Sequence, residues 1–138
     1  MLRKLILALS FSSLAAFSGS VLAAAFDITD IEGRKVHFED QPKTFVVANY
    51  IANFMMVGGA AGLEKVVALT KDGWEDTRYG EYQVFTKSFP KMKDLPSIGG
   101  YHDDILNAEK ILSLHPDVLL IGRTQYAENS QRIKTFEK

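Results

Sequence analysis

The sequence predicts an α/β fold: an open parallel sheet with flanking helices, a Rossmann-like lobe, preceded by a β-hairpin. Three short apolar, partly β-branched runs, 44–48, 66–69 and 118–121, have the near-continuous pattern of strands that are covered on both faces. Segments with helical periodicity separate these runs, and that alternation is typical of a parallel sheet. An alternating stretch at 27–38 with Gly33 at its turn has the pattern of a hairpin.

Three helices are predicted from the spacing of their apolar residues, 51–61, 104–115 and 126–138, and a further helix is expected together with a loop within 70–90. Glycines should end the first helix, and Asp104 or Asn107 should cap the second. The expected buried stripes of these two helices are Ile51, Phe54, Met55 and Ala61, and Ile105, Ala108, Ile111 and Leu112.

The N-terminal residues 1–25 have the pattern of a secretory signal peptide. Arg3 and Lys4 make a short basic start, an apolar stretch with interspersed Ser and Ala follows, and small residues end it. We expect cleavage after Ala23 or Ala25, because a cleavage site requires a small residue two positions earlier, and Val21 and Ala23 stand at those positions. The alternative is a membrane anchor, which is disfavoured by the serines in the apolar stretch and by the lack of a basic cluster directly after it.

The chain contains no cysteine, so the signal peptide carries no cysteine for lipid attachment and the fold depends on its core. We therefore expect an exported, periplasmic protein that is not a lipoprotein. Removing residues 1–25 takes away two basic residues and no acid, which leaves 113 residues with a net charge of −3. This length predicts one domain, and the mild negative charge argues against nucleic acid and anionic membranes as partners.

The candidate ligand site lies where the strands end, because ligands of open parallel sheets bind beyond the carboxyl ends of the strands. This geometry selects four segments: 49–50, 71–78, 99–103 and 123–124. Their aromatic and basic side chains suit a bulky, partly anionic solute. The candidate ligand-binding residues are Asn49, Tyr50, Trp74, Arg78, Tyr101, His102 and Arg123.

Several of these residues have a structural alternative. Trp74, the only Trp of the chain, could instead fill the core. His102 could be a solvated loop histidine, and Arg123 could simply pair with a carboxylate. His102 with Asp103 and Asp104 is not predicted to bind a metal, because three adjacent residues rarely converge on one ion.

The chain is predicted not to be an enzyme, because it contains none of the common catalytic motifs: no HExxH pair, no Gly-x-Ser-x-Gly elbow and no Walker A loop. The glycine-rich stretch 57–62 falls at the end of a predicted helix, which is the wrong context for a dinucleotide site. Two alternatives from other classes remain: a small Rossmann-type enzyme that uses a nucleotide, and a partner-binding lobe without a small ligand.

Four stretches, in this order, carry a resemblance to a known family. They are ITDIEGRKV at 28–36, QPKTFVV at 41–47, GLEKVVA at 62–68, and PSIGG at 96–100 continued by AEKILSLHPDVLLI at 108–121. The last stretch is the most specific, and together the four cover most of the chain after the signal peptide. They resemble the N-terminal lobe of the periplasmic solute-binding proteins of ABC importers for iron–siderophore complexes, haem and cobalamin.

The resemblance implies a two-lobed protein that captures a metal complex between its lobes and delivers it to a membrane permease. It implies that 26–138 form the N-terminal lobe, truncated before the linking helix and the second lobe. Glu109 matches the acidic residue with which the family docks onto permease arginines, although the helix dipole also favours a Glu in a first turn. No cofactor is expected, and the protein should be a monomer.

The expected ligand is therefore an iron complex: a siderophore, haem or a cobalamin-like molecule. The chain departs from the family after the first strand, where Asn49 and Tyr50 stand in place of a Ser or Thr followed by Glu. The aromatic stretch 74–82 is also distinctive, and it keeps a second ligand class open, a metal oxyanion such as molybdate or tungstate, or a nickel chelate.

Overall fold

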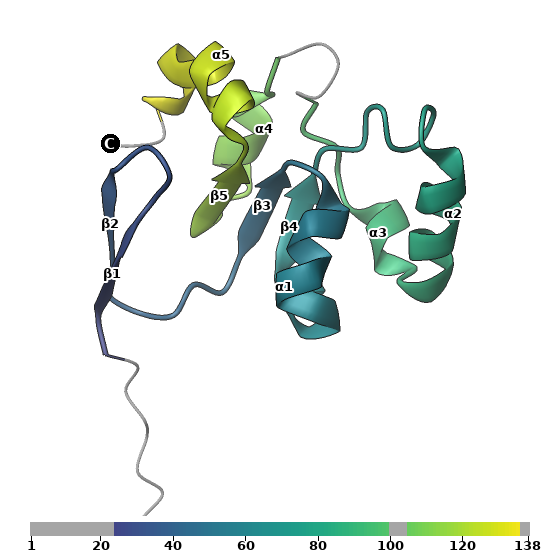
Figure 1. The fold of residues 1–138 in the computed structure, drawn as a ribbon, viewed down its shortest axis with the longest axis horizontal. Helices are drawn as coiled ribbons and strands as arrows, with labels where there is room; N and C mark the ends of the chain where they lie inside the picture. Colours follow the sequence, from purple (N-terminus) through teal and green to yellow (C-terminus); the bar gives the residue numbers. More distant parts are fainter. Residues whose placement is uncertain (1–23, 100–104, 136–138) are drawn as a thin grey trace, which may run out of the picture.

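The computed structural model describes residues 24–99 and 105–135, and it confirms the predicted α/β class (Figure 1). Its centre is an open, parallel three-stranded sheet with the order β4-β3-β5. An antiparallel hairpin of β1 and β2 precedes the sheet, with Phe26 opposite Phe38 at its open end. The strands are β1 (Phe26–Thr29), β2 (Lys35–Phe38), β3 (Phe45–Ala48), β4 (Val66–Leu69) and β5 (Val118–Ile121).

Two hydrophobic clusters cover the two faces of the sheet because successive side chains of β3 point in opposite directions. Val47 belongs to the cluster under α1, α2 and α3, whereas Val46 and Ala48 belong to the cluster that includes Ile111 of α4. Figure 1 shows α1 in front of the sheet and α4 behind it. The helices are α1 (Ile51–Leu63), α2 (Tyr79–Ser88), α3 (Lys91–Asp94), α4 (Ala108–Ser113) and α5 (Arg123–Ile133).

Helix α1 runs past the glycines that were expected to end it. Gly59 adopts φ 56° and ψ −159°, a backbone conformation open to glycine, and it kinks the helix without stopping it. A Cβ at Gly58 would lie 3.1 Å from the ring of Phe54, so this glycine leaves room for that ring. Leu63 is buried at the end of the helix, and Ala61, which the sequence placed on the buried stripe, is exposed.

Helix α4 is shorter than the predicted helix over 104–115. It begins at Ala108 because the Asn107 side chain accepts a 2.9 Å hydrogen bond from the amide of Lys110, as an N-cap does. Of the expected stripe, Ile111 is buried, but Ile105 and Leu112 are 55% and 44% exposed. The buried-stripe prediction was therefore wrong for those two residues, since one lies before the helix and the other on its outer face.

Strand β5 lies at the edge of the sheet, and the hairpin stands beyond it (Figure 1). Asp117, directly before β5, fixes the segment that leads from the hairpin into β3. Its carboxylate accepts hydrogen bonds from the amides of Lys43 and Thr44 at 2.7 and 2.9 Å. These two amides lower the pKa of Asp117 below its ordinary value, the bond from Lys43 contributing most.

The signal-peptide prediction concerns residues that lie almost entirely outside those described. Within 24–99 and 105–135, no helix combines the length and the apolar character needed to cross a membrane.

Candidate functional site

The carboxyl ends of the three parallel strands meet at one edge of the sheet, which we call the rim. Asn49 and Tyr50 follow β3, the loop from Thr70 to Arg78 follows β4, and Arg123 follows β5 after one glycine. The first two of these segments converge. They line a hollow of about 10 Å³, formed by Asn49, Tyr50, Ile51, Thr70, Asp72 and Trp74.

Arg78 and Tyr50 form the most distinctive contact of the rim. The guanidinium carbon of Arg78 lies 4.2 Å from the ring centroid of Tyr50, and its Nη2 donates a 3.0 Å hydrogen bond to the tyrosine hydroxyl. This geometry is a cation–π contact closed by a hydrogen bond. It joins the residue before α1 to the residue before α2, and so it ties together two loops 28 positions apart.

Arg78 is exposed, and the described residues offer it no ion pair. A guanidinium carries five N–H donors, and one bond to a hydroxyl leaves donors for a further acceptor. The rim therefore presents a positively charged, planar group that is held in place by an aromatic ring. Such a group is chemically suited to carboxylate, catecholate or other oxyanion groups.

Trp74 lies beneath the rim and belongs to the core. Its exposed fraction is 4%, and its ring makes edge contacts with Tyr82 and Phe85 at centroid distances of 5.0 and 5.9 Å. Its Nε1 donates a 3.2 Å hydrogen bond to Glu81. Burial raises the pKa of its neighbour Tyr82 above the ordinary value. The structure thus shows the core alternative for Trp74, which also lines the small hollow, and direct ligand contact stays a prediction.

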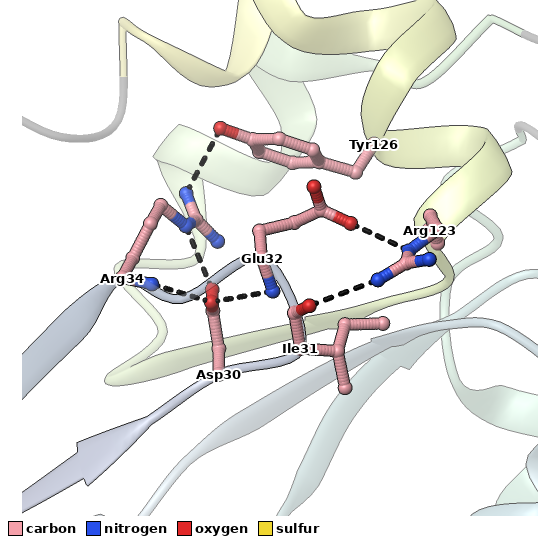
Figure 2. A network of polar contacts seen from close by, with 6 residues as sticks. All are labelled: Asp30, Ile31, Glu32, Arg34, Arg123 and Tyr126. Carbon is pink, nitrogen blue, oxygen red and sulfur yellow. Dashed lines mark hydrogen bonds and ion pairs between the residues drawn. The ribbon is translucent and has the colours of Figure 1, made fainter.

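Arg123 is directed toward the turn of the hairpin (Figure 2). Its Nε lies 2.7 Å from the Glu32 carboxylate, and its Nη2 donates a 2.9 Å hydrogen bond to the carbonyl of Ile31. The carboxylate pairing that the sequence left open is therefore what the structure shows. Arg123 could contact a ligand only if its ion pair with Glu32 were broken.

Tyr101 and His102 lie outside the described residues. The preceding segment reaches the rim, because the hydroxyl of Thr70 donates a 2.9 Å hydrogen bond to the carbonyl of Gly99. Gly99 has φ 66°, and a Cβ there would lie 2.9 Å from a backbone oxygen, so the turn requires glycine. Glu109 follows Gly99 by ten positions and is exposed in the first turn of α4.

Lys71 is a rim residue that sequence reasoning missed. It is buried, and its Nζ donates a 2.7 Å hydrogen bond to the carbonyl of Lys93 and lies 3.5 Å from the Glu75 carboxylate. These contacts fasten the loop after β4 to α3. No local sequence pattern signals the contact with α3, because Lys71 and Lys93 are 22 positions apart.

A larger hollow lies away from the rim, between the hairpin and β5, and we call it the hairpin groove. Its volume is about 390 Å³. Its walls are apolar, with Ile28, Val36 and Phe38 from the hairpin and Val118 to Ile121 from β5. Period-two alternation in 27–38 could have revealed the apolar hairpin face, but no local pattern shows what that face covers.

A network of polar contacts lies among the groove-lining residues at the turn of the hairpin (Figure 2). Arg34 pairs with Asp30 at 2.7 Å and lies over the ring of Tyr126 at 4.4 Å, donating to its hydroxyl at 3.2 Å. The amide of Arg34 and, to a smaller extent, that of Glu32 lower the pKa of Asp30 below its ordinary value. This network fixes the turn of the hairpin to α5.

The described residues contain no group of three His, Cys, Asp or Glu side chains placed to hold a metal ion. To a ligand the rim offers the guanidinium of Arg78, aromatic rings and amide or hydroxyl groups, together with the carboxylate of Asp72 that lines the hollow. No protein-family model matches the chain, and a comparison with curated proteins finds no significant match.

Proposed function

We propose that the chain is the ligand-binding lobe of a periplasmic solute-binding protein that serves an ABC importer. It would capture an iron complex, such as a siderophore, haem or a cobalamin-like molecule, and pass it to the permease without covalent chemistry. Two independent lines support the proposal: the sequence stretches that resemble this family, and a rim whose groups suit an anionic, partly aromatic ligand.

The Arg78–Tyr50 pair is the observation that carries the proposal. A cation that is exposed, pre-oriented by a ring 4.2 Å away and unpaired with any carboxylate of the described residues has its charge available to a ligand. Holding it in place lowers the entropy that a long side chain loses on binding. Its position beyond the ends of β3 and β4 is where open parallel sheets bind ligands.

The size of the rim hollow supports capture between two surfaces. Its volume of about 10 Å³ is far below the roughly 300–1,000 Å³ of pockets that enclose a small molecule. A siderophore or haem would therefore rest on the rim, and a second wall would have to cover its other side. This agrees with the two-lobed arrangement that the resemblance implies.

Direct titration tests the proposal. Haem, a ferric catecholate, a ferric hydroxamate, cobalamin, molybdate and a nickel–histidine chelate are titrated into the full chain by calorimetry. We expect one of the iron or cobalt complexes to bind. Binding of molybdate or the nickel chelate alone would instead support the second ligand class. Binding of none of the six would contradict the proposal.

The ligand that binds is then titrated against variants. Arg78→Ala should weaken binding at least tenfold, because a charge-assisted hydrogen bond contributes about 1.5–3 kcal/mol. Arg78→Lys should lose part of this affinity, since an ammonium lacks the planar fork. Lys87→Ala, which removes an exposed cation of α2, is the matched control and should bind as the unaltered chain does. Equal loss in Arg78→Ala and Lys87→Ala would show that only net charge matters.

Glu109 is the proposed contact with the permease. It is exposed near the start of α4, where nothing in the described residues competes for its carboxylate. Glu109→Gln should leave ligand affinity unchanged and reduce uptake in cells. Loss of ligand affinity in this variant would contradict the docking role.

A further inference from the structure

The parallel sheet has two edge strands, β4 and β5, and the described residues cover only one of these edges. The segment after α3 lies along β4, because the amide of Leu69 donates a 3.2 Å hydrogen bond to the carbonyl of Pro96 and its carbonyl accepts a 3.1 Å bond from the amide of Ile98. Along the outer edge of β5 the described part of the chain places no such segment. An apolar edge strand that is left open in this way is a template for a further strand.

The open edge of β5 directs its backbone groups into the hairpin groove. The amide of Val118 donates a 3.2 Å hydrogen bond to the carbonyl of Thr44, so Val118 and Leu120 direct their backbone groups toward β3. These directions alternate along a strand, so the N–H and C=O groups of Leu119 and Ile121 point away from β3. The hairpin stands on that side of β5 (Figure 1), and both residues line the groove.

The groove is therefore apolar on one wall and polar along one line, and this combination selects the kind of occupant. The apolar wall comes from Ile28, Val36 and Phe38 of the hairpin. An aliphatic ligand would contact this wall, but it would displace water from the N–H and C=O groups of β5 without replacing the hydrogen bonds, which costs free energy. An extended peptide meets both requirements, since donors and acceptors alternate along its edge while its side chains project from its faces.

The charges around the groove favour an uncharged occupant. Two ion pairs, Arg34 with Asp30 and Arg123 with Glu32, each have a separation of 2.7 Å. The remaining charged residue of the lining is Asp117, which lies directly before β5 and accepts hydrogen bonds from two backbone amides. The groove therefore presents no unpaired charge along β5. A charged side chain that entered it would lose hydration without gaining an ion pair.

We propose that the hairpin groove binds an extended segment of another protein as an additional strand on the edge of β5. The segment is uncharged and carries apolar residues at every second position, which face the apolar side of the hairpin. The four residues of β5 span about 13 Å, so a segment of about five residues covers its edge. A second copy of this chain does not fit, because its own β5 stands behind a hairpin in the same way (Figure 1).

Three synthetic peptides of one sequence test whether backbone pairing holds the segment. The sequence is Thr-Val-Thr-Val-Thr-Val-Thr with blocked ends, N-methylated at the threonines, at the valines, or at both. Each of the first two peptides keeps its N–H donors along one edge, and the third keeps none. In calorimetric titrations of the full chain, one of the first two should bind at least tenfold more tightly than the third. Equal affinities, or no binding of any of the three, would overturn the proposal.

Amide exchange in the unaltered chain identifies the edge that is used. The tighter peptide should slow exchange of the Leu119 and Ile121 amides at least tenfold, whereas the Leu120 amide, which is directed toward β3, should change less than twofold. Slow exchange at Leu119 and Ile121 before any peptide is added would mean that the chain covers this edge itself. Protection that rises with protein concentration would mean that a second copy covers it. Either result would overturn the proposal.

A substitution in the hairpin tests the apolar wall. Ile28 lines the groove and is 45% exposed, so Ile28→Lys adds a charge to the wall without opening the core. It should weaken the tighter peptide at least tenfold, while Ile105→Lys, at a residue that is 55% exposed and lies outside the groove, should leave its affinity unchanged. Unchanged affinity in Ile28→Lys would contradict the proposal. None of these measurements uses a transported ligand, so their failure would leave the proposed function intact.

Discussion

The structure contains two arginines that lie over tyrosine rings, and their surroundings differ. Arg78 lies 4.2 Å from the ring centroid of Tyr50 at the rim, and Arg34 lies 4.4 Å from that of Tyr126 at the hairpin turn. Arg34 also forms a 2.7 Å ion pair with Asp30, and the neighbouring Arg123 pairs with Glu32. Within the described part of the chain, Arg78 forms no ion pair.

This difference separates a structural arginine from one that is available to a ligand. At the hairpin turn the charges are neutralised locally, so the network fastens one element to another. At the rim the ring orients the guanidinium without neutralising it, so its field extends into solvent. The packing beneath the two sites also differs, since the rim lies over the buried ring of Trp74 and the hairpin lies beside an open groove.

The largest expected effect is on stability and concerns Trp74, the buried residue beneath the rim. Trp74→Ala should lower the free energy of unfolding by about 3–5 kcal/mol, because it removes a buried ring that contacts Tyr82 and Phe85. Denaturant unfolding followed by circular dichroism measures this loss. Val84→Ala, at an exposed residue of α2, is the control and should stay within about 0.5 kcal/mol of the unaltered chain.

Trp74→Phe distinguishes packing from ligand contact at the same position. It keeps an aromatic ring in the core and gives up the hydrogen bond from Nε1 to Glu81. Most of the stability should therefore return, and ligand affinity should return with it. A variant that is stable but still fails to bind would show that Trp74 contacts the ligand directly.

A smaller effect is expected at the hairpin turn. The Arg123–Glu32 pair is partly solvated, so a double-mutant cycle with Arg123→Ala and Glu32→Ala should give a coupling free energy of about 0.2–1 kcal/mol. Hairpin amides should exchange faster in either single variant, because the turn is less firmly attached to α5. Ligand affinity should not change. A tenfold loss of affinity in Arg123→Ala would place this arginine at the ligand and remove the contrast with Arg78.

The sequence predicted the fold well because the fold depends on local patterns. The runs at 66–69 and 118–121 coincide with β4 and β5, and the alternation around Gly33 coincides with the hairpin. Prediction failed where a distant contact decides the outcome. Helix α1 continues past Gly59 because the helix resumes after the kink to bury Leu63, and no local rule for glycine includes that gain.

The candidate site was predictable only in part, for the same reason. Strand ends were enough to place Tyr50 and Arg78 at one rim, because parallel strands bring their carboxyl ends together. They were not enough to orient Arg123, whose partner Glu32 lies 91 residues earlier in the chain. The hairpin groove was missed altogether. It is lined by the hairpin and by β5, and the strand pattern of each segment carries no sign that the other lies beside it.

The smallest expected effect concerns pH and belongs to the hairpin alone. His37 of β2 faces the carboxylate of Asp27 on β1 at 2.6 Å and that of Glu39 at 3.3 Å, and the bond to Asp27 contributes most to raising its pKa above the ordinary value of about 6.5. A raised pKa in the folded state means that protonation stabilises the hairpin. This stabilisation is complete below about pH 6.5 and is lost as the pH rises through the pKa of His37. Hairpin amides should therefore exchange faster at pH 8 than at pH 6, after correction for the intrinsic rate. NMR titration should show that Asp27→Asn lowers the pKa of His37, whereas an unchanged pKa would mean that this carboxylate does not reach the imidazole in solution.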